Sequence, residues 1–212
     1  MHIHAFSPLE VSQGATTLGV SLDSFLGTLR DAGLGSLPGT AAEVLDDDVR
    51  KILCPDKLNT KQWLDIIATA HNVGLKTTST IMFGHIDTPI NWAKHLMQLR
   101  DLQKKTQGIT EFVPLPFVHM EAPIYLRGLA RPGPTWRETV LIHSVARLVL
   151  YPFINNIQTS WVKLGPIGAS ACLNAGANDL GGTLMNETIT RSAGASHGQE
   201  FNPEQMDDLI NS

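Results

Sequence analysis

The sequence has few of the features that mark secreted, membrane or zinc-binding proteins. Its 212 residues include only two cysteines, Cys54 and Cys172, too few for a disulfide framework and without paired metal-ligand spacing. No apolar run approaches the ~18 residues that a membrane span needs. The first residues, Met1–His4, lack the basic and apolar regions of a signal peptide. We therefore expect a cytoplasmic protein without a membrane partner.

Charge is also sparse. Charged residues make up 17% of the chain and the formal net charge is −4, which excludes a disordered acidic tail and a global basic surface for nucleic acid. The apolar fraction of 42% suits one large globular domain, or part of one, since domains usually run to ~100–200 residues.

Short apolar runs alternate with amphipathic, capped segments along the chain. The predicted strands are His2–Phe6, a short run at Gly35–Pro38, Lys76–Phe83, Glu111–Phe117 and Ile157–Lys163, with a last strand or turn at Asn178–Gly182. The predicted helices are Leu22–Ala32 capped by Ser21, a short helix opened by Asp46–Asp48, one capped by Thr60, one opened by Thr88-Pro89, one from the capping box Thr135–Glu138 to Leu150, one over Gly165–Gly176, and Pro203–Ile210.

Strand followed by helix five times over predicts an α/β fold with a parallel sheet, here an incomplete parallel (β/α) barrel of about five units. Residues 1–185 would form the barrel part and 186–212 a polar tail with a short helix. A flavodoxin-like open sheet is the alternative, although Gly33-Leu34-Gly35 lacks the third glycine of a phosphate-binding fingerprint. Five units do not close a barrel, so the chain is a fragment, needs a partner or forms an open sheet. We expect it to be poorly soluble or oligomeric alone.

Two histidines near the start suggest metal chemistry. His2 and His4 lie on one side of a predicted strand because side chains alternate along it, and such a pair can bind a metal together with His85 and Asp179. The alternative is that His4 only forms a hydrogen bond to a neighbour.

Other polar residues follow the predicted strands, where parallel barrels carry their sites. Glu43 lies among small residues and can accept two ribose hydroxyls, or it can simply cap a helix or pair with an arginine. Ser79 and His85 flank the end of the third strand, and His85 can titrate near neutrality or be a structural histidine. Further polar candidates are Gln158, Ser160, Asn178 and Asp179.

Six runs occur in the order typical of one enzyme family. They are His2–Pro8, Pro38–Glu43, Thr77–His85, Glu111–Phe117, Asn156–Lys163 and Asn178–Met185. Together they resemble the radical S-adenosylmethionine (radical SAM) enzymes of deazaflavin (coenzyme F-420) biosynthesis, the FO synthase family, in its 4-hydroxyphenyl-transferase half. Relatives in menaquinone synthesis share the looser pattern, but Pro-Leu-Pro-Phe at 114–117 and Gln-Thr-Ser-Trp at 158–161 favour the deazaflavin enzymes.

The resemblance implies a barrel that binds S-adenosylmethionine and a [4Fe-4S] cluster, which together supply a 5′-deoxyadenosyl radical. The reaction it implies is transfer of the 4-hydroxybenzyl group of tyrosine to 5-amino-6-(D-ribitylamino)uracil. It assigns Glu43 to S-adenosylmethionine. It assigns to the two substrates His4, Ser7, Ser79 and His85, and to the ribityl chain Gln158, Ser160, Asn178 and Asp179.

One family feature is missing. Members carry a Cys-x-x-x-Cys-x-x-Cys loop after the first barrel strand, and Cys54 and Cys172 cannot replace it because three thiolates must reach one cluster. We therefore expect the C-terminal portion of such an enzyme, inactive without the missing N-terminal half of the barrel, whether in the same or a separate chain. No catalytic residue or cluster ligand is assigned. A metal-dependent hydrolase using His2 and His4, or a non-catalytic barrel-completing subunit, stays open.

Overall fold

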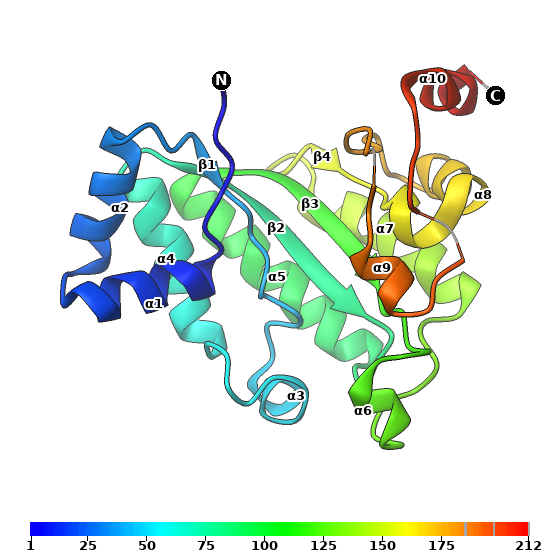
Figure 1. Cartoon of the computed structure of the whole chain (residues 1–212), viewed down its shortest axis with the longest axis horizontal. Coiled ribbons are helices and arrows are strands. Elements are labelled where there is room, and N and C mark those ends of the chain that lie inside the picture. Colours follow the sequence, from blue (N-terminus) through cyan, green and yellow to red (C-terminus); the bar gives the residue numbers. More distant parts are fainter. Residues whose placement is uncertain (185, 197, 212) are drawn as a thin grey trace. The chain divides into compact units, whose positions relative to one another are not determined.

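The computed structural model describes residues 1–184, 186–196 and 198–211, and it shows an α/β fold on a four-stranded parallel sheet (Figure 1). The strands are β1 (Ser36–Leu37), β2 (Lys76–Phe83), β3 (Ile109–Pro116) and β4 (Asn156–Ile157), hydrogen-bonded in that order. The helices are α1 (Pro8–Leu18), α2 (Leu22–Asp31), α3 (Asp47–Leu53), α4 (Thr60–Asn72), α5 (Pro89–Thr106), α6 (Pro123–Leu126), α7 (Trp136–Leu150), α8 (Trp161–Leu173), α9 (Ile189–Ser192) and α10 (Pro203–Asn211). Sequential parallel strands joined through helices are compatible with part of a β/α barrel.

The chain forms two compact units, and β2 and β3 contribute to both. The first unit consists of Met1–Ile81, Pro89–Phe112 and Val149–Asn155. The second consists of Met82–Thr88, Val113–Leu148 and Asn156–Ser212.

The core of the first unit lies between β1 and the mutually contacting helices α1, α2 and α4. Leu26 is fully buried there, and Leu22, Phe25 and Leu29 pack around it, so the predicted apolar stripe of this helix is confirmed. Ser21 caps α2 by accepting a hydrogen bond from the backbone N–H of Ser24, also as predicted.

The core of the second unit joins α8 to α10. Trp161 contacts Phe201 with ring centroids 5.1 Å apart, and Met206 of α10 is buried in the same cluster. The predicted terminal helix therefore forms and packs on α8. The predicted division between barrel and tail falls at Met185, which lies outside the described residues.

Several predicted elements are confirmed with small shifts. Lys76–Phe83 is β2 with the predicted bounds. Thr135 and Glu138 form the expected capping box, with the Glu138 N–H bonded to the Thr135 hydroxyl and the Thr135 N–H bonded to the carboxylate. The cap of α4 is Asn59 rather than Thr60, because the Asn59 and Gln62 side chains satisfy each other's backbone N–H groups.

Two predicted strands are wrong in extent. In place of the strand His2–Phe6 there is a single parallel bridge from His4 to Ser36, because Phe6 has a φ of 64° and Ser7 already caps α1. In place of Ile157–Lys163, β4 ends at Ile157, a bridge joins Gln158 to Asp179, and α8 begins at Trp161. Gly165, with a φ of 67°, interrupts α8, so a first helical turn at Trp161 precedes the helix predicted to open at Gly165.

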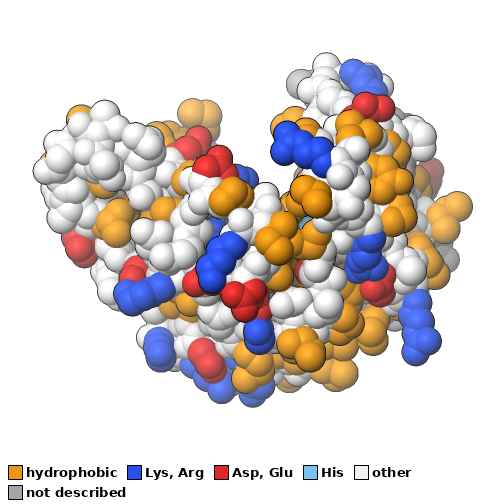
Figure 2. Space-filling view, turned by 90° about the horizontal axis from the view of Figure 1, so that it is seen from below, with side chains coloured by type: hydrophobic (Ala, Val, Ile, Leu, Met, Phe, Trp, Pro, Cys, Tyr) orange, Lys and Arg blue, Asp and Glu red, His pale blue; other side chains and the backbone are white. Residues whose placement is uncertain are grey.

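The face drawn in Figure 2 has no large patch of one charge, because basic, acidic and apolar side chains are interspersed on it. Within the described part of the chain, none of the helices has both the length and the apolar character of a membrane span.

Candidate functional site

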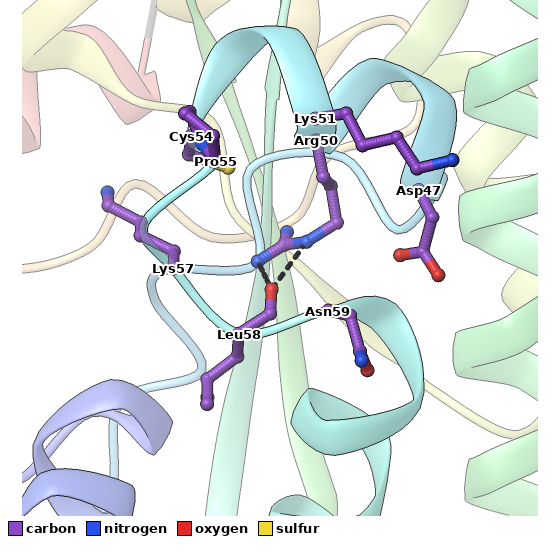
Figure 3. A pocket seen from close by; sticks show the side chains of 8 residues that line it. All are labelled: Asp47, Arg50, Lys51, Cys54, Pro55, Lys57, Leu58 and Asn59. Carbon is purple, nitrogen blue, oxygen red and sulfur yellow. Dashed lines mark hydrogen bonds between the residues drawn. The ribbon is translucent and has the colours of Figure 1, made fainter.

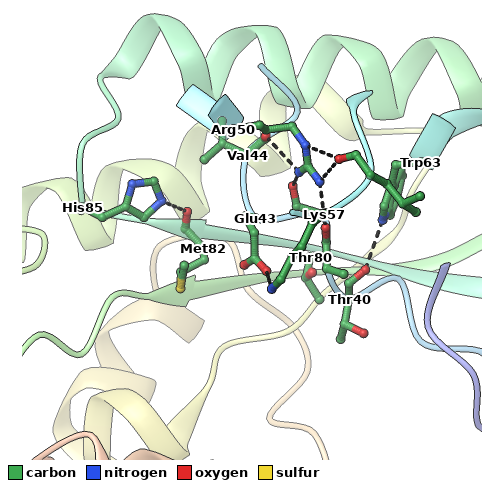
Figure 4. Close-up of polar contacts among 12 residues, drawn as sticks. Thr40, Glu43, Val44, Arg50, Lys57, Trp63, Thr80, Met82 and His85 are labelled. Atoms are coloured by element: carbon green, nitrogen blue, oxygen red, sulfur yellow. Dashed lines mark hydrogen bonds and ion pairs between the residues drawn. The ribbon is translucent and has the colours of Figure 1, made fainter. Parts of the chain in front are cut away.

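Arg50 fixes the path of the segment that follows β1. Its side chain is buried at 3% exposure, and its guanidinium donates to the carbonyl oxygens of Ala41, Ala42 and Leu58 (Figures 3 and 4). Ala41 and Glu43 in this segment have left-handed φ values of 57° and 45°. Because buried carbonyls need donors, this arginine holds the segment in a path that its residues would otherwise disfavour.

Glu43 pairs with a lysine across a turn of chain. Its Oε1 lies 2.7 Å from Nζ of Lys57, and its side chain is 16% exposed (Figure 4). Burial works to lower the pKa of Lys57, but the hydrogen bond and charge of Glu43 outweigh it, so that pKa is raised. A partly open carboxylate therefore stands after β1, and its ion-pair partner is Lys57.

At Gly39 the small residue makes room for β2. A Cβ there would lie 2.0 Å from the carbonyl oxygen of Thr78. The Gly39 N–H donates to the Thr78 hydroxyl, and the Thr80 hydroxyl donates to the Gly39 carbonyl. The small residue at position 39 therefore accommodates the neighbouring strand.

Side chains of helix α5 form hydrogen bonds to the segment that follows β1. His95 is fully buried and its Nδ1 accepts a hydrogen bond from the Leu45 N–H at 3.0 Å. Burial, with the charge of Arg50, lowers its pKa to about 3, so the ring is neutral. Asp46 caps α3 and accepts from Lys94 and Asn91 at 2.8 and 3.0 Å. Sequence spacing gave no signal for Lys57, Arg50 or His95, because their partners are carbonyls and groups distant along the chain.

His85 lies in a closed turn after β2. Its Nε2 donates to the carbonyl of Met82 at 2.9 Å, and its Nδ1 accepts from the Ile86 N–H at 2.7 Å (Figure 4). The Asp87 carboxylate receives the N–H groups of Gly84 and His85. The imidazole is 1% exposed, so the geometry is that of a histidine that shapes its own turn.

The other candidates of the first unit are bonded within it. His2 and His4 both contact the Ser36 hydroxyl, at 2.7 and 2.6 Å, and burial together with His2 lowers the pKa of His4. Ser7 is the cap of α1. Ser79 is fully buried and donates to the Glu111 carbonyl. Across the described residues, no three His, Cys, Asp or Glu side chains are grouped as a metal site would require.

The ribityl-chain candidates lie in the second unit, and the structure brings three of them together. The parallel bridge places Gln158 beside Asp179. The neighbouring Asn178 accepts from the Ile157 N–H and from Arg147 at 2.8 and 2.6 Å. Ser160 is 7% exposed at the start of α8, where its side chain makes no capping bond.

The two cysteines do not fit an iron–sulfur cluster. Cys54 belongs to the first unit and Cys172 to the second, and both are buried and free. Burial raises the pKa of each thiol, which disfavours the thiolate that a cluster needs. The two cysteines of the sequence therefore do not fit the thiolate ligation that such a cluster needs.

Comparison with known proteins shows which family the chain belongs to. The family model described as "CofH/MqnC C-terminal region" matches residues 106–212. The chain belongs to this family.

Curated relatives give the family's named activities. The chain is 56% identical over 198 residues to "FO synthase" of Mycobacterium leprae and of Streptomyces coelicolor, covering 93% of this chain and 23% of each relative. It is 53% identical over 210 residues to "5-amino-6-(D-ribitylamino)uracil--L-tyrosine 4-hydroxyphenyl transferase" of Methanopyrus kandleri, covering 99% of this chain and 57% of that relative. The chain thus spans about a quarter to somewhat over half the length of these relatives.

Proposed function

We propose that this chain is the C-terminal portion of a radical S-adenosylmethionine enzyme that transfers the 4-hydroxybenzyl group of tyrosine to 5-amino-6-(D-ribitylamino)uracil in FO biosynthesis. The observation that carries the proposal is the 53% identity to a transferase of that name over 99% of this chain. The incomplete (β/α) barrel of about five units is part of the proposal, and the four-stranded parallel sheet supports it.

We divide the chemistry between this chain and the part of its relatives that the chain does not match. In the family, S-adenosylmethionine and the cluster supply the radical, and we assign the cluster ligands to the part of the relatives that this chain does not match. No step through the cluster is assigned to residues of this chain, since its two buried thiols do not fit one.

The role proposed for the first unit is to hold the cofactor's sugar. The Glu43 Oε1 is paired with Lys57 Nζ, and the loop that carries Glu43 is fixed by Arg50 and His95. A carboxylate oxygen has lone pairs for more than one donor, so Glu43 can retain Lys57 and accept a ribose hydroxyl. A positioned group of this kind orients a cofactor without reacting itself.

The role proposed for the polar cluster of the second unit is to bind the ribityl chain. Gln158, Asn178 and Asp179 share one bridge and its flanking turn, and a polyol needs several hydrogen-bond partners. His4, Ser7, Ser79 and His85 stay proposed substrate contacts, although each already has a partner within the fold.

Complementation tests the function. The chain would be mixed anaerobically with a separately produced segment of the Methanopyrus kandleri relative that this chain does not match. We expect product formation that requires tyrosine, the ribitylaminouracil and S-adenosylmethionine together. Association without turnover would favour a non-catalytic barrel-completing subunit, and stoichiometric zinc with hydrolase activity in the isolated chain would favour the hydrolase.

A further inference from the structure

A cavity of about 370 Å³ opens in the second unit where β3 ends. Its walls include Phe117, His119 and Met120 after β3, Trp136 at the start of α7, and Lys163 in α8. The loops at 132–134 and 195–196 complete it. None of the site residues predicted from the sequence lines it. The position is where parallel β/α folds place ligands, and the volume is within the range of small-molecule sites.

Two glycines with positive φ lie where segments around the cavity pack closely against each other. Gly194 has a φ of 100°, and a Cβ there would lie 2.6 Å from Cβ of Met120. Gly133 has a φ of 78°, and its Cβ would lie 2.9 Å from the carbonyl oxygen of Phe117. A hydrogen bond from the Glu121 N–H to the Ala193 carbonyl joins two of the walls. The cavity is thus shaped by defined local structure.

The lining is mostly apolar and aromatic. Phe117 is 8% exposed, whereas the indole of Trp136 leaves 55% of its surface open. A tryptophan with so much exposed surface offers a flat apolar face for a ring to stack on. The Thr139 hydroxyl of the lining already donates to the Thr135 carbonyl, so it offers a ligand only its acceptor lone pairs.

Lys163 is the charged side chain of this lining. Its Nζ has a weak contact with the Thr190 hydroxyl at 3.5 Å, and burial lowers its pKa although Glu187 opposes the shift. A partly desolvated amine gains most from an acceptor oxygen placed within its reach. A ligand for this cavity therefore combines an aromatic ring with such an oxygen.

We propose that this cavity binds the hydroxylated aromatic ring of the amino-acid substrate, with Trp136 stacking on the ring and Lys163 donating a hydrogen bond to an oxygen of the ligand. The inference rests on the proposed function and deepens it, because tyrosine, the donor substrate of that function, carries a hydroxylated aromatic ring. The phenol oxygen and the carboxylate are the two acceptors that Lys163 can meet.

Binding of free ligands to the 212-residue chain tests this inference without any turnover. Affinity for L-tyrosine, L-phenylalanine and tyramine would be measured by saturation-transfer NMR. We expect Trp136→Leu to weaken L-tyrosine binding about tenfold or more, as for an aromatic anchor, and Lys163→Met to do the same. L-phenylalanine lacks the phenol oxygen, so its affinity should not change in Lys163→Met if Lys163 binds the phenol. Tyramine lacks the carboxylate, so its affinity should not change in Lys163→Met if Lys163 binds the carboxylate.

Matched controls lie outside the cavity. Lys105→Met removes an exposed lysine of α5, and Leu148→Ala removes a side chain of α7 that is 80% exposed; both should leave affinity unchanged. Trp136→Phe, which keeps a ring, provides the second measurement if the leucine variant does not fold. The inference is overturned if L-tyrosine does not bind the chain at millimolar concentration, or if the cavity variants and controls bind it equally.

The two proposals fail separately. Turnover in the complementation experiment with tyrosine affinity independent of Trp136 and Lys163 would overturn the cavity assignment alone. Tyrosine binding that depends on both residues, without transfer to the ribitylaminouracil in any complemented sample, would overturn the proposed function and leave the cavity as a site for hydroxylated aromatic ligands.

Discussion

Lys57 Nζ and Glu43 Oε1 lie 2.7 Å apart, joining the segment after β1 to the turn between α3 and α4. The lysine side chain is 34% exposed and the glutamate side chain 16%. Such a half-open pair contributes little to folding, yet it holds a carboxylate in a fixed place. A fixed carboxylate that adds little stability is better explained by a role in binding than by a role in folding.

Glu43→Gln should therefore change binding more than stability. We expect the free energy of unfolding to fall by about 1 kcal/mol or less, because the pair is partly solvated. In the complemented enzyme, KM for S-adenosylmethionine should rise about tenfold or more, the equivalent of ~1.4 kcal/mol. Asp48→Asn, at a side chain that is 89% exposed, is the control. An unchanged KM would remove Glu43 from the proposed cofactor site.

Arg50→Met should be strongly destabilising. It leaves the buried carbonyls of Ala41, Ala42 and Leu58 without their charged donor, and we expect a loss of about 3–5 kcal/mol, measured by urea unfolding. Lys51→Met on the same helix, where the side chain is 75% exposed, should change stability by less than ~0.5 kcal/mol. Similar losses in both variants would show that Arg50 does not anchor this segment.

Gly39→Ala tests the contact with β2. The added methyl would meet the Thr78 carbonyl oxygen at 2.0 Å, so we expect a loss of about 2 kcal/mol or more. Gly27→Ala in α2 is a matched control with open space around the new methyl, and helix propensity predicts a gain of roughly 0.5–1 kcal/mol. Equal thermal unfolding midpoints for the two variants would contradict this packing.

Acidification should destabilise the first unit through the partly buried His71 and the buried His95. Burial and the charge of Lys76 lower the pKa of His71 to about 4, and that of His95 is about 3. Both folded values lie below the unfolded value of about 6.5, so the unfolded chain binds more protons and stability falls as pH drops below about 6.5. For His71 the loss continues to about pH 4.

His71→Gln isolates this effect from carboxylate titration. Its free energy of unfolding should depend less on pH between 6.5 and 4 than that of the unchanged chain, as followed by urea unfolding at several pH values. Parallel pH profiles for the two proteins would show that His71 is not held neutral by burial.

The sequence predicted elements that local rules determine. β2 follows from its β-branched run, α2 from its Ser21 cap and apolar stripe, and α7 from the box of Thr135 and Glu138. Helix α1 was missed, although Ser7 and Glu10 form a capping box with Pro8 at the first turn, which was a readable signal.

For the site, residue type and place after a strand are all that the sequence offers, and the roles of Glu43 and Asp179 stay predictions. Lys57 and Arg50 act on groups that are distant along the chain or on backbone carbonyls, so no spacing reveals them. The cavity at Trp136 and Lys163 depends on how α7 and α8 meet the end of β3, which is tertiary information. The strand predicted over Ile157–Lys163 was too long: β4 ends at Ile157 and the chain is helical from Trp161, a change that β propensity alone does not reveal.

Iron analysis of the assembled protein tests the central claim most directly. The chain and the complementary segment of the Methanopyrus kandleri relative would be reconstituted anaerobically with iron and sulfide, separately and together, and then separated by size. We predict a one-to-one complex that carries one [4Fe-4S] cluster and an isolated 212-residue chain that carries none. A cluster bound by this chain alone, or no complex at micromolar concentration, would contradict the account.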